Sequence, residues 1–182
     1  LGPGYANGIA NLHNASRARV PVLNMIGDHA THHLELDAPL TSDIDGLTSA
    51  VCAWTGVSTS PDDLPEVGLK AWQASMEYPG NVTAFVAPAN HAWDPAGGDV
   101  DIPDIPAPKT LSEDEMMEAA EALRNSDSAA LFMGGHALRE SGLLQAGRIA
   151  EAPGARLITE TFVTRQQRGV GRVETERLPS FG

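Results

Sequence analysis

Short apolar runs alternate with helical patterns along this chain. The apolar runs are bounded by Pro, Gly or polar residues, as is typical of strands buried in a parallel sheet. They cover residues 20–27, 53–58, 82–87, 128–133 and 156–161. Apolar residues at helical spacing mark the segments between and before them, at about 6–19, 44–51, 61–78, 112–123 and 137–152. The alternation predicts an α/β protein with parallel sheets and flanking helices.

Local signals predict where several of these elements begin and end. Gly2-Pro3-Gly4 predicts a sharp turn before the first helix, because Pro fixes φ and Gly tolerates unusual backbone angles. Thr41-Ser42-Asp43 can cap the helix that follows it, and Ser60-Pro61 is typical of a helix start. Pro79-Gly80 is expected to end that helix.

The composition changes between residues 94 and 110. Pro and Gly alternate there with Asp, which is typical of an extended, solvated linker. The linker divides the chain into residues 1–93 and 111–182, which we expect to form two partial Rossmann-like domains. The first three predicted strands then form one parallel sheet, and the last two form a second.

Composition and charge indicate which kinds of partner the protein can bind and in which cellular compartment it works. The 182 residues carry a net charge of −12, which argues against nucleic acid as a partner because phosphate binding needs clustered Lys and Arg. The single cysteine, Cys52, cannot form an internal disulfide and is typical of a reducing compartment. No apolar run approaches the roughly 20 residues that span a bilayer. We therefore predict a cytoplasmic protein with no membrane or nucleic-acid partner.

The opening segment carries the first candidate site. Gly2, Pro3, Gly4 and Asn7 precede an apolar helix and then a strand that ends at Gly27. This order resembles the second half of the pyrimidine-binding domain of thiamine diphosphate enzymes, specifically the acetolactate synthase large-subunit-like family. The resemblance implies that Gly2, Pro3, Gly4 and Asn7 lie against the aminopyrimidine ring of the cofactor. A flat ring needs close backbone approach, and its polar edge needs a neutral hydrogen-bonding side chain. Without that context, the residues form an ordinary turn before a helix.

The second candidate site follows the strand that ends at Gly27. His29, His32 and His33 lie where loops at the carboxyl ends of parallel strands gather ligands. Imidazole titrates near neutral pH, so these side chains can handle protons near a substrate. The resemblance places the loop on the substrate side of the cofactor; otherwise the histidines are polar loop or interface residues. Acetolactate synthases carry Asp-Ala-Phe-Gln where this chain has Asp37-Ala38-Pro39-Leu40, so the substrate stays open.

A third segment resembles the central domain of the same family. Gly134-Gly135 lies between a strand and a helix, although the full Gly-x-Gly-x-x-Gly fingerprint is missing. The family's central domain binds FAD in true acetolactate synthases and is empty in many relatives. The segment 166–172 is also similar to that family, and we expect Arg168 and Arg172 to form ion pairs or an interface.

The resemblance covers nearly all of the chain and implies a function for the parent protein. That protein uses thiamine diphosphate and Mg²⁺ to cleave or form a C–C bond of a small 2-oxo acid, as a homodimer or tetramer. The family's catalytic Glu lies upstream of the Gly-Pro-Gly segment, and its magnesium–diphosphate segment lies downstream; neither occurs in this sequence. We therefore expect a fragment in which 1–93 belongs to the pyrimidine domain and 111–182 begins the central domain. The chain alone should be inactive and should bind the cofactor weakly.

Two other functions stay open from the residues alone. A dinucleotide-binding module could use Gly134-Gly135, with Glu160 at the end of the next strand holding a ribose. A metal-dependent hydrolase could use His29, His32, His33 and Asp37 as ligands, although their spacing matches no standard zinc signature.

Overall fold

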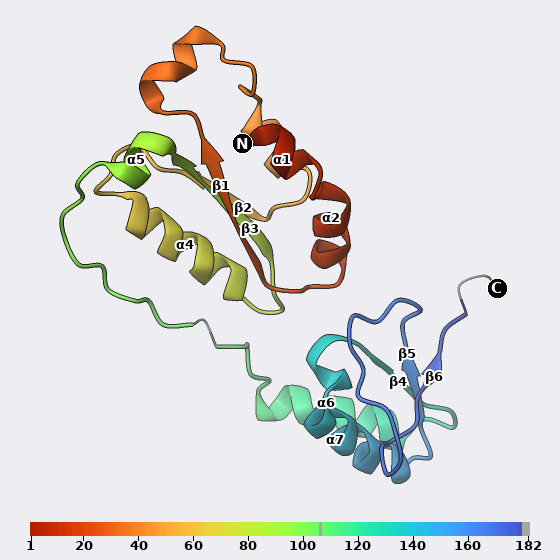
Figure 1. Ribbon diagram of the computed structural model, residues 1–182. Coiled ribbons are helices and arrows are strands. Elements are labelled where there is room, and N and C mark those ends of the chain that lie inside the picture. Colours follow the sequence, from red (N-terminus) through yellow and green to blue (C-terminus); the bar gives the residue numbers. More distant parts are fainter. Residues whose placement is uncertain (106, 180–182) are drawn as a thin grey trace. The chain divides into compact units, whose positions relative to one another are not determined.

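The chain forms two compact units, Leu1–Pro108 and Lys109–Gly182 (Figure 1). The computed structural model describes residues 1–105 and 107–179; Pro106 of the predicted linker and the last three residues of the predicted second domain lie outside the described residues. Within these residues, each unit contains one three-stranded sheet, with strand orders β1-β3-β2 and β4-β5-β6. All strand pairings in this part of the chain are parallel. The predicted α/β class is confirmed, and the five predicted strands divide between the two sheets as expected.

The first sheet is built around a buried central strand. β1 (Val22–Asp28) and β2 (Trp54–Val57) both pair with β3 (Val82–Pro88). All seven residues of β3 are buried, which explains its continuous apolar sequence. Alternate side chains of a strand point to opposite faces, so β3 contributes to two cores. One core contains Ala84 and Val86, and the other contains Phe85 and Ala87.

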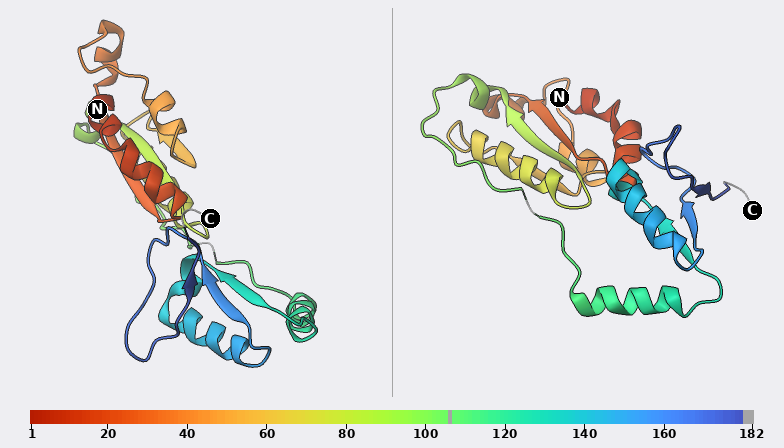
Figure 2. Two further views of the ribbon diagram at one scale, coloured as in Figure 1. Left: turned by 90° about the vertical axis from the view of Figure 1, so that its right-hand side faces the viewer. Right: turned by 90° about the horizontal axis from the view of Figure 1, so that it is seen from below.

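Helices cover the two faces of this sheet (Figures 1 and 2). α4 (Leu64–Met76) packs Ala71 against Phe85 on one face. On the other face, α3 (Ile44–Ser49) packs Ile44 against Ala84 and Val86. The predicted cap of α3 is confirmed, because the Asp43 carboxylate accepts a 2.8 Å hydrogen bond from the backbone N–H of Gly46. The second face also carries α1 (Gly2–Ala6) and α2 (Ile9–Arg17).

The predicted turn at the start of the chain is wrong. Gly2, Pro3 and Gly4 form the first turn of α1 instead. Pro suits this position because its fixed φ is helical and a first-turn N–H has no partner within the helix. Gly2 is buried there, and a Cβ added to it would lie 2.3 Å from the Cβ of Ser42. Glycine thus permits the close approach of α1 to the segment before α3.

The helices expected at 61–78 and 137–152 both begin later than predicted. α4 starts at Leu64, because Asp63 makes hydrogen bonds to Ser58, Thr59 and Ser60 and holds residues 60–63 in a turn. The predicted helix 137–152 is a 3₁₀ turn, η2 (Gly135–Leu138), followed by α7 (Glu140–Glu151). The break falls at Arg139, whose backbone is extended.

The described residues between 95 and 110 form no helix or strand after α5 (Ala89–Trp93). This segment still contacts the first unit. The Gly97 N–H donates to Asp62 over 2.8 Å, and the Gln73 amide donates to the Asp104 carbonyl over 3.3 Å. The Pro/Asp-rich stretch is therefore extended, as its composition predicts, but anchored at two points.

The second unit has its own core beneath a smaller sheet. β4 (Ala130–Met133), β5 (Arg156–Thr159) and β6 (Glu176–Arg177) are its strands. The core brings together buried residues from β4, η2, α7 and β5: Met133, Leu138, Leu143, Ala146, Ala150 and Leu157. Sequence patterns missed β6, because it has only two residues and both are charged. Among the described residues, no helix is long and apolar enough to cross a membrane.

Replacing Ser112 by Ala should destabilise α6 (Glu113–Arg124) by about 1 kcal/mol. Ser112 and Glu115 form a capping box, in which the Glu115 N–H donates to Ser112 Oγ over 3.2 Å and the Ser112 N–H donates to the Glu115 carboxylate over 2.8 Å. Amide hydrogen exchange in α6 measures the change. Ser141→Ala, at an exposed position of α7, is the control. Unchanged protection of α6 in the Ser112 variant would contradict the cap's contribution.

Candidate functional site

A pocket of about 530 Å³ lies at the carboxyl ends of β1 and β3. Three segments far apart in the sequence line it: the N-terminal residue, the segment after β1 and the α5 region. The lining residues are Leu1, Gly27, Asp28, His29, Ala30, His32, His33, Ala89, Asn90, Trp93 and Asp94. This is the edge of a parallel sheet at which ligands are expected to bind.

All three predicted histidines line this pocket. The backbone N–H of His29 donates to the Asp28 carboxylate over 2.8 Å, which fixes the turn after β1. His32 and His33 lie on a 3₁₀ turn, η1 (Thr31–Leu36), with ring centroids 4.2 Å apart in an edge-to-face arrangement. Within the described part of the chain, His29 Nε2 is buried without a hydrogen-bond partner. A buried polar atom without a partner is rare in folded proteins, and such atoms occur at functional sites.

Asn90 joins α5 to residues 29–36, the segment after β1 that carries the three histidines and is called the histidine segment below. The Thr31 N–H donates to Asn90 Oδ1 over 2.9 Å, and Asn90 Nδ2 donates to Thr31 Oγ1 over 3.2 Å. Trp93, on the same helix, is 80% exposed and also lines the pocket. Sequence reasoning did not single out Asn90 or Trp93. The available signal was their position directly after a buried strand, which matches the position of His29.

The predicted residues of α1 lie beside this pocket but do not line it. Of the opening segment, only Leu1 is among the lining residues. Pro3, Gly4 and Asn7 are exposed, whereas Gly2 is buried against Ser42. The opening segment and the histidine segment therefore share one edge of the first sheet. Contact of Gly2, Pro3, Gly4 and Asn7 with a cofactor stays a prediction.

Tyr5 is partly buried and packs against the core. It contacts the cluster that includes Ile26 and Val86, and its hydroxyl lies 3.2 Å from Cys52 Sγ. Burial, and then the hydrogen bond with Cys52, raise the pKa of the Tyr5 hydroxyl. By contrast, three leucines at or beyond η1 are 39%, 72% and 46% exposed: Leu34, Leu36 and Leu40. The histidine segment thus presents apolar side chains to its surroundings.

A buried polar cluster connects α5 with the residues that precede α4. Ser58 and His91 are both buried, and Ser58 Oγ lies 2.7 Å from Asp63 Oδ1 and 2.9 Å from His91 Nδ1. Hydrogen bonds from Thr59, then from Ser58 and Ser60, lower the pKa of Asp63 to about 2. The ionised carboxylate can only accept, so Ser58 donates to Asp63 and His91 Nδ1–H donates to Ser58. The cluster ties α5 to the start of α4.

Replacing Asp63 by Asn should destabilise the first unit by about 1 kcal/mol at pH 7. The lowered pKa stabilises the folded unit above the ordinary carboxyl pKa, and this contribution is lost as the pH falls from about 4 to about 2. The variant should lack that part of the acid dependence. Urea unfolding at several pH values, followed by tryptophan fluorescence, measures both effects. Asp101→Asn is the control, and a wild-type acid dependence retained in the Asp63 variant would contradict the assignment.

The second unit brings Glu160 to the predicted glycine pair. A Cβ added to Gly134 would lie 3.9 Å from the Glu160 carboxylate, and Gly135 has a φ of +53°. However, α7 begins only at Glu140, so the glycine pair does not lead directly into a helix N-terminus of the kind that binds phosphate. The dinucleotide interpretation stays a prediction. The expected ion pair is confirmed for Arg172, which contacts Glu140, whereas Arg168 donates to the Gln166 amide oxygen.

Comparison with known proteins decides the family. The chain is 39% identical over 181 residues to a Mycobacterium tuberculosis protein provisionally named acetolactate synthase large subunit IlvX. The match covers 100% of this chain and 35% of the relative. The chain belongs to the acetolactate synthase-like family of thiamine diphosphate-dependent enzymes. The family predicted from the sequence is thereby confirmed.

More distant relatives agree with this assignment. The acetolactate synthase large subunit of Corynebacterium glutamicum is 23% identical over 165 residues, which cover 87% of this chain and 26% of that protein. The solved structure of a thiamine diphosphate-dependent 4-hydroxybenzoylformate decarboxylase from Rhodococcus jostii RHA1 has the same fold, with a TM-score of 0.76 at 17% identity. That likeness covers 87% of this chain and 31% of the decarboxylase. No family model matches the chain.

This acetolactate synthase-like chain spans about a quarter to a third of the length of its curated relatives. Its described residues contain no group of three or more His, Cys, Asp or Glu side chains arranged to hold a metal ion. The metal-dependent hydrolase based on His29, His32, His33 and Asp37 therefore has no ligand set in that part of the chain.

Proposed function

We propose that this chain forms the pyrimidine-binding side of a thiamine diphosphate-dependent enzyme that cleaves or forms a C–C bond of a 2-oxo acid. The observation that carries the proposal is the pocket at the carboxyl ends of β1 and β3, whose lining includes His29 with its buried and unpartnered Nε2. Family membership makes a thiamine diphosphate cofactor the chemically consistent ligand. When bound, that cofactor supplies the carbanion stabilisation that such reactions need.

The pocket suits the ring of this cofactor better than its diphosphate. Its lining, as far as the described residues form it, includes Asp28 and Asp94 but no Lys or Arg side chain, so a polyanion would be repelled. Asn90 offers a neutral polar edge, and Trp93 offers an apolar face. The diphosphate and Mg²⁺ would be held by residues of the parent protein outside this pocket. FAD in the second unit is not required by this proposal.

The histidines have different roles in this proposal. His29 is half-buried, and its Nε2 would make a hydrogen bond to the bound ring or substrate. His32 and His33 are exposed on the pocket rim, where each could donate a proton to substrate or accept one from it. The hydrogen bonds between Thr31 and Asn90 would hold that rim in place.

The parent protein is proposed to be a cytoplasmic homodimer or tetramer. Leu34, Leu36 and Leu40 support this part of the proposal, because exposed apolar side chains next to a ligand pocket are typical of a surface that a partner covers. The pocket would then be completed by another subunit.

The isolated chain is expected to give no turnover of pyruvate above a control without protein. Turnover by the chain alone would overturn the proposal that other parts of the parent protein complete the site.

Histidine ring NMR tests the ligand assignment on the chain itself. Titration with a free aminopyrimidine, the ring portion of thiamine, should shift the ring signals of His29, His32 and His33, with weak affinity in the millimolar range. His13 lies on α2 and His136 lies in the second unit, so both should stay unshifted as internal controls. The His29→Ala variant should lose saturable binding. If no ring signal shifts, or if all shift equally, the pocket assignment is wrong.

A further inference from the structure

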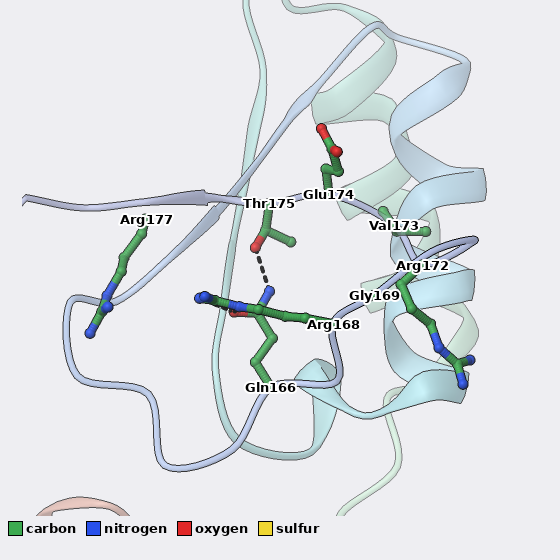
Figure 3. Close-up of a pocket in the computed structure, with 8 residues that line it drawn as sticks. All are labelled: Gln166, Arg168, Gly169, Arg172, Val173, Glu174, Thr175 and Arg177. Atoms are coloured by element: carbon green, nitrogen blue, oxygen red, sulfur yellow. Dashed lines mark hydrogen bonds between the residues drawn. The ribbon is translucent and has the colours of Figure 1, made fainter.

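The loop between β5 and β6 forms a second pocket, within the second unit (Figure 3). The pocket has a volume of about 480 Å³, which falls in the range of small-molecule sites. Three arginines line it, in a chain whose net charge is −12. The polar side chains that matter for the argument are Gln166, Arg168, Arg172, Glu174, Thr175 and Arg177.

Arg168 is held in this pocket by a neutral partner. Its Nε and Nη2 both donate to Gln166 Oε1, over 3.0 and 2.8 Å, and Gln166 Nε2 donates to Thr175 Oγ1 over 2.6 Å. The guanidinium is therefore fixed in place without being neutralised. A guanidinium carries five N–H donors, so Arg168 retains donors for a ligand.

Arg177 is also held without a carboxylate. Its Nε donates to the backbone carbonyl of Thr161. The ion pairs among the described residues leave Arg168 and Arg177 without an acidic partner, whereas Arg172 is paired with Glu140. Figure 3 shows Arg168 and Arg177 extending toward the same side, with Arg172 and the Glu174 carboxylate directed elsewhere.

Two fixed and uncompensated guanidinium groups in one pocket favour a dianion. The planar donor fork of Arg matches the oxygens of a phosphate, and a phosphate monoester carries nearly two charges at neutral pH, whereas a carboxylate carries one. We propose that this pocket binds a phosphate group, free or as part of a small phosphorylated molecule, with Arg168 and Arg177 as its donors.

Isothermal titration of the chain with inorganic phosphate and with AMP, at constant ionic strength, tests this proposal. Both probes should bind saturably, and Arg168→Gln and Arg177→Gln should each weaken binding about tenfold or more. Arg168→Lys keeps the charge but loses the fork, so its loss should be smaller but measurable. Tighter binding of AMP than of phosphate would indicate an organic phosphate, and equal binding would indicate the free ion.

Arg165→Gln is the matched control, because Arg165 lies in the same loop but does not line the pocket. It should change the affinity less than twofold. Arg168 and Arg177 are exposed, so neither substitution leaves a cavity, and an unchanged amide NMR spectrum checks the fold of each variant. Absence of saturable binding, or equal weakening in the Arg165 variant, would overturn the proposal. Either result leaves the function proposed for the first unit untouched, because its pocket is formed by other residues.

Discussion

Replacing Leu143 by Ala should destabilise the second unit by about 3 kcal/mol. Leu143 is 1% exposed and packs in the cluster that contains Leu138 and Leu157. Its truncation removes buried methyl groups and leaves a cavity in a small core, so the loss is a large fraction of a typical domain's stability.

The next residue of the same helix supplies the control. Leu144 is 47% exposed, and Leu144→Ala should change the unfolding free energy by less than about 0.5 kcal/mol. Amide NMR signals of residues 109–179 report unfolding of the second unit. All three tryptophans, Trp54, Trp72 and Trp93, belong to the first unit, so the fluorescence transition should stay unchanged. Equal effects of the two leucine substitutions would contradict the core assignment.

Replacing Gly80 by Ala should destabilise the first unit by about 3 kcal/mol. Gly80 precedes β3 and has a φ of +128°, a backbone conformation that residues with a side chain rarely adopt. An added Cβ would also lie 2.5 Å from the carbonyl oxygen of Arg19, which is backbone and cannot rotate away. Strain and overlap therefore act together.

Gly98 separates the steric overlap from the backbone strain, because a substitution there meets only the strain. It has a φ of +95°, but no atom lies within 4 Å of its Cβ position, in the extended segment after α5. Gly98→Ala keeps the backbone strain without the overlap, so it should cost about 1 kcal/mol. Urea unfolding followed by tryptophan fluorescence compares the variants. A Gly80 variant as stable as the Gly98 variant would show that the segment before β3 rearranges freely.

The sequence predicted the part of the candidate site that comes directly after a clearly apolar strand. The run that ends at Gly27 is apolar and bounded, so its carboxyl end, and with it His29, could be placed from the sequence. Asn90 and Trp93 escaped notice because neither belongs to a motif and α5 is only a five-residue helix. Their place in the pocket depends on which strand lies beside β1, and no local pattern contains that information.

The conformation of the opening segment could not be predicted from the sequence, for a different reason. Gly2-Pro3-Gly4 is compatible both with a tight turn and with the first turn of a helix, since Pro satisfies either. Burial of Gly2 against Ser42 accompanies the helical form, and this contact joins residues forty positions apart. Asn7 follows that helix on an exposed turn, so its position depended on the same choice.

The sequence by itself determined the α/β class, the five main strands, the capped start of α3 and the extended Pro/Asp-rich segment. These features arise from local apolar periodicity, capping side chains and backbone restriction, which act over a few residues. Only the tertiary structure decided the order β1-β3-β2, which sets the histidine segment beside α5, and the pairing of charged β6 with β5. Strand neighbours and pocket walls depend on how faces of distant elements bury one another, and this free energy belongs to the packed whole rather than to any one segment.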